Sequence, residues 1–252
     1  ATRMRTGWPT PRSIAQSALR TTDGSSGAVS IRENVADVDA RIARACERAG
    51  RSRDDVTLVA VSKTFPASFI DEAIDAGITD VGENRVQEAR EKKPLVRGSA
   101  RWHLIGHLQT NKSKDAVKLF DVVQAVDSLD LAEKLARAAD AHGKRQEVML
   151  QVNIGDEPQK SGLARGDVDA IAKQAAVFPS LHVIGLMAIP PIGTPEESRP
   201  YFRELRSMRD ALGLRHLSMG MSEDFETAIE EGSTIVRVGR AIFGSRPARP
   251  AA

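Results

Sequence analysis

Short apolar, β-branched segments alternate with helical patterns eight times along this chain, and this alternation restricts the possible folds more than any other feature. The strand-like segments lie at 56–62, 80–82, 102–105, 122–126, 148–154, 183–189, 216–219 and 234–238. The helical patterns between them lie at 66–76, 86–93, 112–120, 128–142, 167–177, 196–212 and 223–231. Because hairpins need connections of only about two to five residues, connections of this length predict parallel strands.

Two architectures join parallel strands through helices: a closed (β/α)8 TIM barrel and an open, doubly wound sheet. The open sheet usually has a glycine-rich turn after its first strand, whereas this chain continues into Ser62-Lys63-Thr64 and contains no G-x-G-x-x-G or Walker motif. Its 252 residues match the length of about 250 that is typical of the barrel. The sequence therefore favours an α/β fold that is a single TIM barrel.

An additional amphipathic helix precedes the first strand-like segment. Its apolar residues recur every three or four positions, at Ile31, Val35, Val38, Ile42 and Cys46, and Gly50 ends it. Cys46 is the only cysteine, and its place on this stripe indicates a core residue rather than a nucleophile. We therefore predict a barrel domain at 28–246 with an extra N-terminal helix.

The first 27 residues are rich in Ser, Thr, Arg, Gly and Pro and hold few large apolar side chains. Such a segment buries too little surface to offset the entropy of ordering, so we predict a disordered tail at 1–27 and a second one at 247–252. A transit peptide has the same Arg-rich, acid-poor composition and is the alternative interpretation of residues 1–27.

Charge and hydropathy exclude several kinds of partner. The net charge is +2, but residues 1–22 carry four arginines and no acid, so the remainder has 32 basic against 34 acidic residues. This mildly acidic body gives little electrostatic support for nucleic-acid binding. No run of 18 apolar residues is present to span a membrane. The single cysteine excludes an intrachain disulfide and is typical of a cytoplasmic protein.

In a TIM barrel the active site lies at the carboxyl ends of the strands, which here present Lys63 after the first strand. Lys63 follows an almost wholly apolar run, so we expect it at the barrel mouth and partly removed from water. Loss of solvation lowers the pKa of a lysine and makes its amine a nucleophile toward carbonyls. A lysine that merely extends into solvent is the structural alternative.

The ends of the seventh and eighth strands match the usual phosphate-binding place of such barrels. Gly220 and Ser222 precede one helix, and Gly239 allows close approach to the backbone of the next turn. Ordinary glycine turns and a serine helix cap are the alternative. A carbonyl-seeking lysine opposite a phosphate-binding turn suits pyridoxal 5′-phosphate (PLP), which carries an aldehyde and a phosphate.

His103 and His107 form an H-x-x-x-H pair that raises the question of a metal site. They bracket a predicted strand, in which four residues span roughly 13 Å, too far for one zinc ion to bridge. The zinc motif H-E-x-x-H is absent as well, so we predict no metal site. We interpret His103 as structural and His107 as a residue at the rim of the cofactor site.

Seven motifs follow one another along the chain: A-V-S-K-T (60–64), V-G-E-N-R-V-Q-E (81–88), H-L-I-G-H-L-Q-T-N-K (103–112), K-S-G-L (160–163), G-L-M (185–187), L-S-M-G-M-S-E-D (217–224) and V-R-V-G-R-A-I-F-G (236–244). Together they resemble the pyridoxal phosphate homeostasis protein family, over residues from about 31 to 245. The resemblance implies a barrel similar to the N-terminal domain of alanine racemase.

The resemblance also implies site residues. It implies that PLP is held as a Schiff base on Lys63, and that Lys160 of the K-S-G motif takes part in releasing or rebinding it. It matches Asn84, Ser218, Ser222, Arg237 and Gly239 to positions at the cofactor, and His107, Met219 and Gly220 join this set as residues at the strand ends. Many members have a second lysine where this chain has Phe65, so the transfer role of that lysine is not carried over.

Members of this family are regarded as PLP carriers in vitamin B6 homeostasis, without an established enzyme activity. We therefore expect a cytoplasmic, monomeric PLP carrier that has no turnover of its own, binds no nucleic acid or membrane, and passes PLP to PLP-dependent apoenzymes. A scaffold without a ligand is a weaker interpretation, because the site residues converge on one rim.

The alternative function is that of a PLP-dependent, racemase-like enzyme on the same barrel. Alanine racemases continue into a β-domain, whereas this sequence ends eight residues after Gly244. The only tyrosine, Tyr201, lies in a predicted helix away from the mouth and offers no second base. The resemblance places Arg237 like the arginine that faces the pyridine nitrogen in the racemase fold. Such a donor keeps its proton, which weakens the ring as an electron sink.

Overall fold

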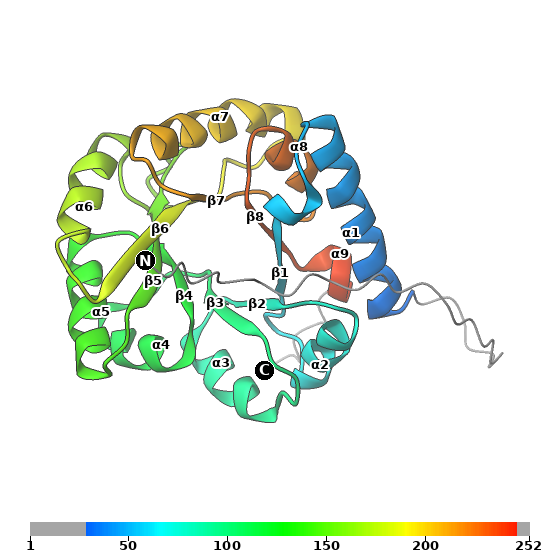
Figure 1. Ribbon diagram of the computed structural model, residues 1–252, viewed down its shortest axis with the longest axis horizontal. Coiled ribbons are helices and arrows are strands. Elements are labelled where there is room, and N and C mark those ends of the chain that lie inside the picture. Colours follow the sequence, from blue (N-terminus) through cyan, green and yellow to red (C-terminus); the bar gives the residue numbers. More distant parts are fainter. Residues whose placement is uncertain (1–28, 246–252) are drawn as a thin grey trace, which may run out of the picture.

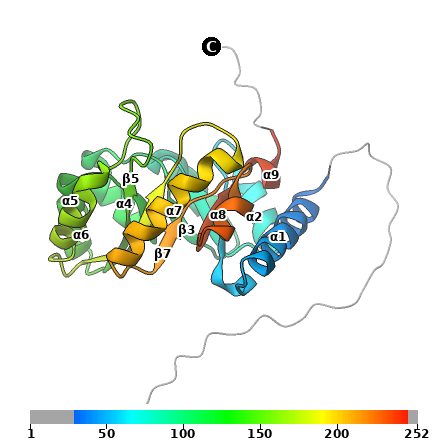
Figure 2. The same cartoon turned by 90° about the horizontal axis from the view of Figure 1, so that it is seen from above.

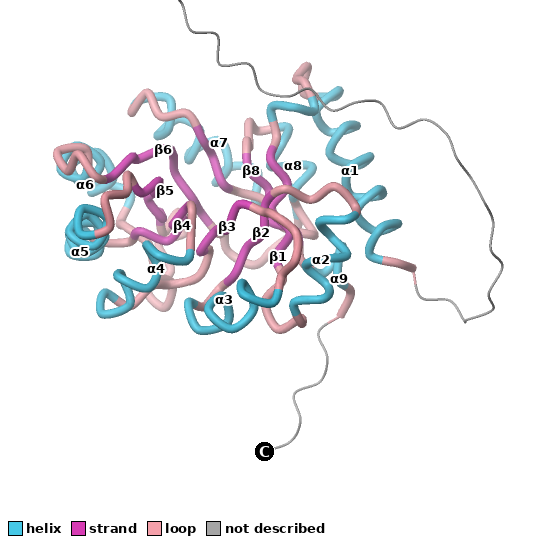
Figure 3. The backbone as a smooth tube through the Cα atoms, turned by 60° about the horizontal axis from the view of Figure 1, so that its bottom comes forward, coloured by secondary structure: helices cyan, strands magenta, loops and turns pink. Residues whose placement is uncertain are grey.

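Eight parallel strands close into a barrel in the computed structural model, which describes residues 29–245. The strands are β1 (Thr57–Val61), β2 (Asp80–Glu83), β3 (Arg101–Leu104), β4 (Val122–Val126), β5 (Gln146–Val152), β6 (Leu181–Ala188), β7 (His216–Ser218) and β8 (Ile235–Val238). Each strand pairs with the next, and β8 pairs with β1 to close the ring. The predicted TIM barrel is confirmed, with its strands inside and its helices outside (Figures 1 and 3).

A helix lies in every connection between successive strands, as parallel pairing requires. The helices are α1 (Ile31–Arg48), α2 (Ala67–Asp75), α3 (Val86–Lys92), α4 (Ser113–Leu119), α5 (Leu129–Ala141), α6 (Val168–Ala175), α7 (Pro195–Ala211), α8 (Phe225–Glu230) and α9 (Arg240–Phe243). Short 3-10 turns are η1 (Arg53–Asp55), η2 (Lys93–Leu95), η3 (Thr110–Lys112) and η4 (Arg165–Asp167).

The extra N-terminal helix is α1, as predicted. The Ser30 hydroxyl accepts the Glu33 backbone N–H, and the Glu33 carboxylate accepts the Ser30 N–H, which satisfies two donors at the helix start. The apolar stripe packs on α2, α8 and α9 and buries Cys46 (Figures 1 and 2). The helix therefore covers the side of the barrel where β8 meets β1.

Two apolar cores stabilise the barrel. The larger core lies between the strands and the helices. The smaller core fills the barrel interior with inward side chains that include Val59, Val122, Met149, Met187 and Ile235. Because successive strand residues point to opposite faces, Arg237, two positions after Ile235, also points inward.

Several element boundaries differ from the predicted ones. β5 and β6 begin two residues earlier, where Gln146 pairs in register with Leu181. Gln146 is polar and so lacked a strand signal, but its amide donates to the Asp121 carbonyl and it is fully buried. α8 begins at Phe225 rather than at 223, because the Asp224 carboxylate accepts the Met221 N–H and closes a turn before the helix.

The two predicted tails, 1–27 and 247–252, lie outside the described residues. Within residues 29–245, no helix is both long enough and apolar enough to cross a membrane.

Candidate functional site

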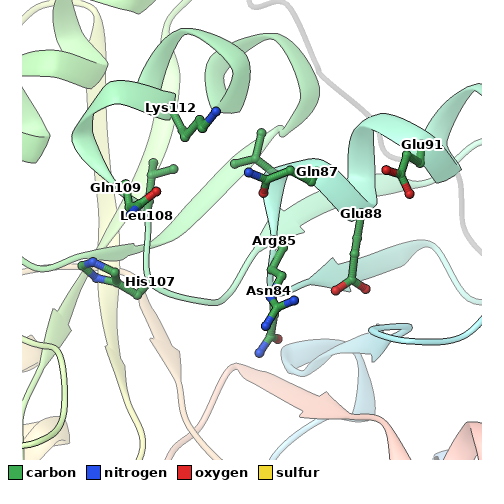
Figure 4. Close-up of a pocket in the computed structure, with 10 residues that line it drawn as sticks. Asn84, Arg85, Gln87, Glu88, Glu91, His107, Leu108, Gln109 and Lys112 are labelled. Atoms are coloured by element: carbon green, nitrogen blue, oxygen red, sulfur yellow. The ribbon is translucent and has the colours of Figure 1, made fainter. Parts of the chain in front are cut away.

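Two adjoining cavities lie at the carboxyl ends of the strands and share Asn84 and His107. The larger cavity, of about 460 Å³, lies beside α3 and η3, and its polar lining includes Arg85, Gln87, Gln109 and Lys112 (Figure 4). The smaller cavity, of about 270 Å³, extends across the mouth to the β5–α6 connection and is lined there by Asn153, Lys160 and Ser161. Three predicted site residues, Asn84, His107 and Lys160, therefore lie on one continuous surface.

The two side chains at the edge of the smaller cavity are held by neighbours. His107 is exposed, and its Nδ1 lies 2.8 Å from an Asp127 carboxylate oxygen. Lys160 is half-buried, donates to the Pro190 carbonyl at 2.9 Å and forms an ion pair with Glu157. Both side chains therefore lie on the cavity at the carboxyl ends of the strands.

Lys63 lies directly beyond β1, half-buried, in a segment whose backbone is held on both sides. Lys92 of α3 donates to the Ser62 carbonyl at 2.9 Å, and the Thr64 N–H donates to a Glu88 carboxylate oxygen at 3.0 Å. Thr64 has a φ of 70°, a left-handed conformation that is rare for a β-branched residue. These contacts determine the direction in which Lys63 leaves the strand.

A buried carboxylate lies behind the Lys63 segment. Glu83 is fully buried; its Oε1 accepts the Ser62 hydroxyl at 2.6 Å and the Lys92 ammonium at 2.8 Å, while its Oε2 has no hydrogen-bond partner. Burial raises the pKa of Glu83 more than the hydrogen bonds from Lys92 and Ser62 lower it. This residue therefore depends on Lys92 to remain ionised.

The guanidinium of Arg237 is buried near the end of β8 and is only 4% exposed. It donates to the Ser218 hydroxyl at 2.6 Å and to the Ala188 carbonyl at 3.0 Å. Burial lowers its pKa to about 10, against the opposing charge of Asp224, so it is positively charged at neutral pH. Within residues 29–245 no carboxylate forms an ion pair with it, so a buried cation is available to a ligand.

The turns after β7 and β8 are tied together. Gly220 has a φ of 93°, and a Cβ there would lie 2.6 Å from the Ala228 Cβ, so this turn requires glycine. The Gly220 carbonyl accepts the Arg237 N–H at 3.0 Å, and the Ser222 hydroxyl accepts the Ala241 N–H at 3.4 Å. These contacts join the turn at Gly220 and Ser222 to Arg237 and Ala241.

The strand order changes one expectation. Since β1 pairs with β8, Lys63 lies beside the Gly239 turn rather than opposite it. A Cβ on Gly239 would lie 3.1 Å from the Val61 carbonyl oxygen, so glycine permits this close approach. The lysine and the proposed phosphate-binding turn therefore occupy neighbouring strand ends.

Ser218 and Met219 point to opposite faces of the sheet. Ser218 is inside the barrel on Arg237, whereas Met219 is fully buried in the larger core between strands and helices. The Met219 N–H is engaged with the Ile235 carbonyl at 3.2 Å. The Met219 side chain therefore packs between the strands and the helices and does not reach the mouth of the barrel.

Sequence reasoning missed Asp80 and Gln124, which flank the buried His103. The ring of His103 lies 2.8 Å from an Asp80 carboxylate oxygen and 2.9 Å from the Gln124 amide nitrogen, which accounts for a structural histidine there. The available signal was Gln124 itself, a lone polar residue in the run V-V-Q-A-V. In the described part of the chain no group of three or more His, Cys, Asp or Glu residues is arranged to hold a metal ion.

Comparison with known proteins gives consistent results. Residues 34–247 match the family model of the alanine racemase N-terminal domain. The pyridoxal phosphate homeostasis proteins of Escherichia coli K12 and Aquifex aeolicus are 44% and 42% identical to this chain, covering 86% and 85% of it and 97% of each relative.

Solved structures extend these matches. PipY of Synechococcus elongatus PCC7942, solved with PLP bound, is 37% identical, with a TM-score of 0.76 over 85% of this chain and 100% of PipY. An alanine racemase of Clostridium difficile 630 is 13% identical, with a TM-score of 0.64 over 86% of this chain and 58% of the racemase. At that identity the likeness concerns the fold alone.

Proposed function

We propose that this protein binds PLP at the mouth of the barrel. The chain belongs to the pyridoxal phosphate homeostasis protein family and has the barrel of the alanine racemase N-terminal domain. The PLP-bound structure of the relative PipY supports this proposal. The observation that carries it is the buried cation of Arg237, which lacks a carboxylate partner within residues 29–245 and lies one strand away from Lys63.

The residues at the mouth fit the groups of PLP. Burying a cation without a counter-ion is costly, so a site of this kind is suited to an electron-rich ligand such as a pyridine nitrogen or a phosphate. Arg237 would donate to the ring, with Ser218 holding the guanidinium. The backbone of the turns at Gly220, Ser222 and Gly239 would hold the phosphate, and Asn84 and His107 would border the ring.

Lys63 would hold the aldehyde end of PLP as a Schiff base. When bound, PLP supplies an aldehyde that condenses with a primary amine and releases one water. The half-buried position of Lys63 and the backbone contacts at Ser62 and Thr64 support this assignment, because they hold the segment that carries the lysine at the carboxyl end of β1.

Lys160 would assist the departure of PLP. Its amine lies on the smaller cavity, which also includes Asn84 and His107, so it borders the space through which a ligand leaves. Its contacts to the Pro190 carbonyl and to Glu157 are on the β5–α6 and β6–α7 connections and can be exchanged for a phosphate.

We further propose a role in PLP homeostasis without turnover, with PLP-dependent apoenzymes as recipients. The names of the relatives support the role. The large apolar side chains exposed within residues 29–245 lie on separate segments, at Val29, Leu95, Val177, Ile192 and Met221, which supports a monomer. The lone cysteine supports a cytoplasmic location.

Reduction with borohydride tests the covalent assignment. Protein loaded with PLP is reduced, digested and examined by mass spectrometry, and we expect the pyridoxyl group on the Lys63 peptide alone. Lys63→Ala should lose the visible absorbance band and the adduct, whereas Lys173→Ala, an exposed lysine of α6, should keep both. An adduct on another lysine would overturn the role of Lys63, and absence of any PLP binding would overturn the function.

A further inference from the structure

Five polar side chains form one continuous chain of hydrogen bonds through the otherwise apolar barrel interior. Arg237 donates to Ser218 Oγ at 2.6 Å, and the Ser218 hydroxyl donates to Gln124 Oε1 at 2.6 Å. Gln124 Nε2 lies 2.9 Å from His103 Nδ1, and His103 Nε2 lies 2.8 Å from Asp80 Oδ1. All five side chains are buried, so each contact is made in a low-dielectric environment.

The chemistry of the two ends determines the direction of every bond. A guanidinium only donates, so Ser218 Oγ accepts from Arg237 and its single hydrogen goes to Gln124 Oε1. The Gln124 amide N–H then points at His103 Nδ1, which must carry a lone pair. His103 is therefore the Nε2–H tautomer and donates to the Asp80 carboxylate.

The carboxylate maintains this direction. A reversed chain would place an unprotonated His103 nitrogen against the Asp80 oxygen, which is repulsive while Asp80 is ionised. Burial opposes ionisation of Asp80, but its interactions with His103, Thr79 and Arg101 together outweigh burial and lower its pKa. A cation at one end and an anion at the other thus polarise all the links in the same sense.

Strand β4 brings Gln124 into this hydrogen-bond chain by regular alternation, because Gln124 lies two positions after the inward Val122. The register between β4 and β5 shifts between Val123 and Val126. Val122 and Ala125 both belong to the inner core, so the irregularity turns Ala125 inward directly after Gln124. The departure from regular geometry therefore follows the residue that connects the two halves of the hydrogen-bond chain.

We propose that Asp80, His103 and Gln124 are positioning residues for the cofactor site, a proposal that rests on the proposed function. They do not touch the ligand. Their bonds commit the Ser218 hydrogen to Gln124, so that Arg237, and not the Ser218 hydroxyl, donates to the ring nitrogen of PLP. The barrel interior thus sets the donor pattern at the mouth and keeps the ring nitrogen an acceptor.

Asp80→Asn tests this proposal because it keeps the size of the side chain and removes the negative charge that orients the hydrogen bonds from Arg237 to Asp80. Nitrogen-15 NMR of histidine-labelled full-length protein should show His103 as the Nε2–H tautomer in the wild type and as a mixture of tautomers in the variant. PLP affinity should fall about tenfold. Loss of a hydrogen-bond partner behind a metal ligand lowers metal affinity by about 10- to 100-fold, and we expect an effect at the lower end of this range. The absorbance maximum of bound PLP should shift as well.

Asp71→Asn is the matched control, because Asp71 is an equally buried carboxylate on α2 that accepts hydrogen bonds from Arg97 and Gly98 and takes no part in the hydrogen-bond chain. It should leave the tautomer, the affinity and the spectrum unchanged. Wild-type protein with an Nδ1–H tautomer at His103 would overturn the proposal without any variant. Unchanged tautomer, affinity and spectrum in Asp80→Asn would also overturn it, whereas a wild type that binds no PLP would instead overturn the proposed function.

Discussion

The Lys92 ammonium lies 2.8 Å from Oε1 of Glu83, a carboxylate that is fully buried between β2 and the helices. The same ammonium donates to the Ser62 carbonyl, next to Lys63. Removing one member of a buried pair leaves a charge without compensation, which costs more than the pair itself contributes. This pair therefore links the stability of the fold to the backbone that carries Lys63.

We expect Lys92→Met to lower the free energy of unfolding by about 3–5 kcal/mol at neutral pH. The pKa of Glu83 is already raised by burial and would rise further without Lys92. When the pKa of a carboxyl group is higher in the folded protein than in the unfolded chain, the free energy of unfolding decreases as the pH rises above the unfolded pKa. The loss of unfolding free energy in Lys92→Met, measured by urea unfolding, should therefore be larger at pH 8 than at pH 5.

Lys144→Met provides the control for this experiment. Lys144 is also a partly buried lysine, but within residues 29–245 its ammonium donates to the backbone carbonyls of Val117 and Phe120. Removing the Lys144 ammonium leaves no buried carboxylate of residues 29–245 without its partner. The loss of unfolding free energy should therefore be smaller than in Lys92→Met and nearly the same at both pH values. Equal losses with equal pH dependence in the two variants would contradict the role of Glu83.

Acid should destabilise the protein through His216. Burial, followed by the charges of Arg215 and Arg101, lowers its pKa to about 4. The unfolded chain then binds a proton below about pH 6.5 while the folded protein does not, so stability falls as pH falls from about 6.5 to 4. Since the side chain is only partly buried, we expect this loss to be at most about 3 kcal/mol.

Urea unfolding of His216→Gln between pH 7.5 and 4.5 measures this contribution. At pH 7.5 the variant loses only the contact with Thr234. Its stability should then decline less steeply on acidification than that of the wild type. Parallel declines would assign the acid sensitivity to other groups.

The sequence predicted the barrel because its eight alternations are local signals that tertiary packing did not override. It also predicted that Lys63, Arg237 and the glycine turns lie at the carboxyl ends of the strands, which converge in a closed barrel whatever the details of packing. The buried hydrogen-bond chain through Gln124 was not predictable, because it depends on which inward side chains face each other across the interior. The outward direction of Met219 was missed, although alternation with Ser218 would have given it.

Arg237→Gln should weaken PLP binding about ten- to a hundredfold, the effect of losing a charge-assisted hydrogen bond of about 1.5–3 kcal/mol. The fold should persist, because the variant also removes the cost of burying a cation without an ion-pair partner. Spectrophotometric titration with PLP gives the affinity, and urea unfolding of the ligand-free protein checks the fold. An unchanged titration would argue against Arg237 as a ligand residue.

Gly220→Ala should destabilise the protein by more than the cost of placing an L-residue at a positive φ in the turn after β7. Any L-residue at such a φ costs about 1–2 kcal/mol, and Gly213→Ala, at a φ of 63° with open space around it, measures that cost. At Gly220 the methyl group would also meet Ala228 and Phe225. We expect a larger loss of stability and weaker PLP binding than in Gly213→Ala, and equal effects would contradict the packing argument.

The last prediction concerns turnover, which we expect to be absent. Racemisation needs a second base, and the only tyrosine, Tyr201, lies on α7 and packs on the core between strands and helices. Arg237 donates a hydrogen bond but keeps its proton, so it does not turn the ring into a strong electron sink. PLP-loaded protein is incubated with L- and D-alanine in deuterated water, and exchange at the α-carbon is followed by proton NMR, with Lys63→Ala as the control. Exchange should stay at the level of free PLP; exchange over many turnovers that depends on Lys63 would establish an enzyme instead of a carrier.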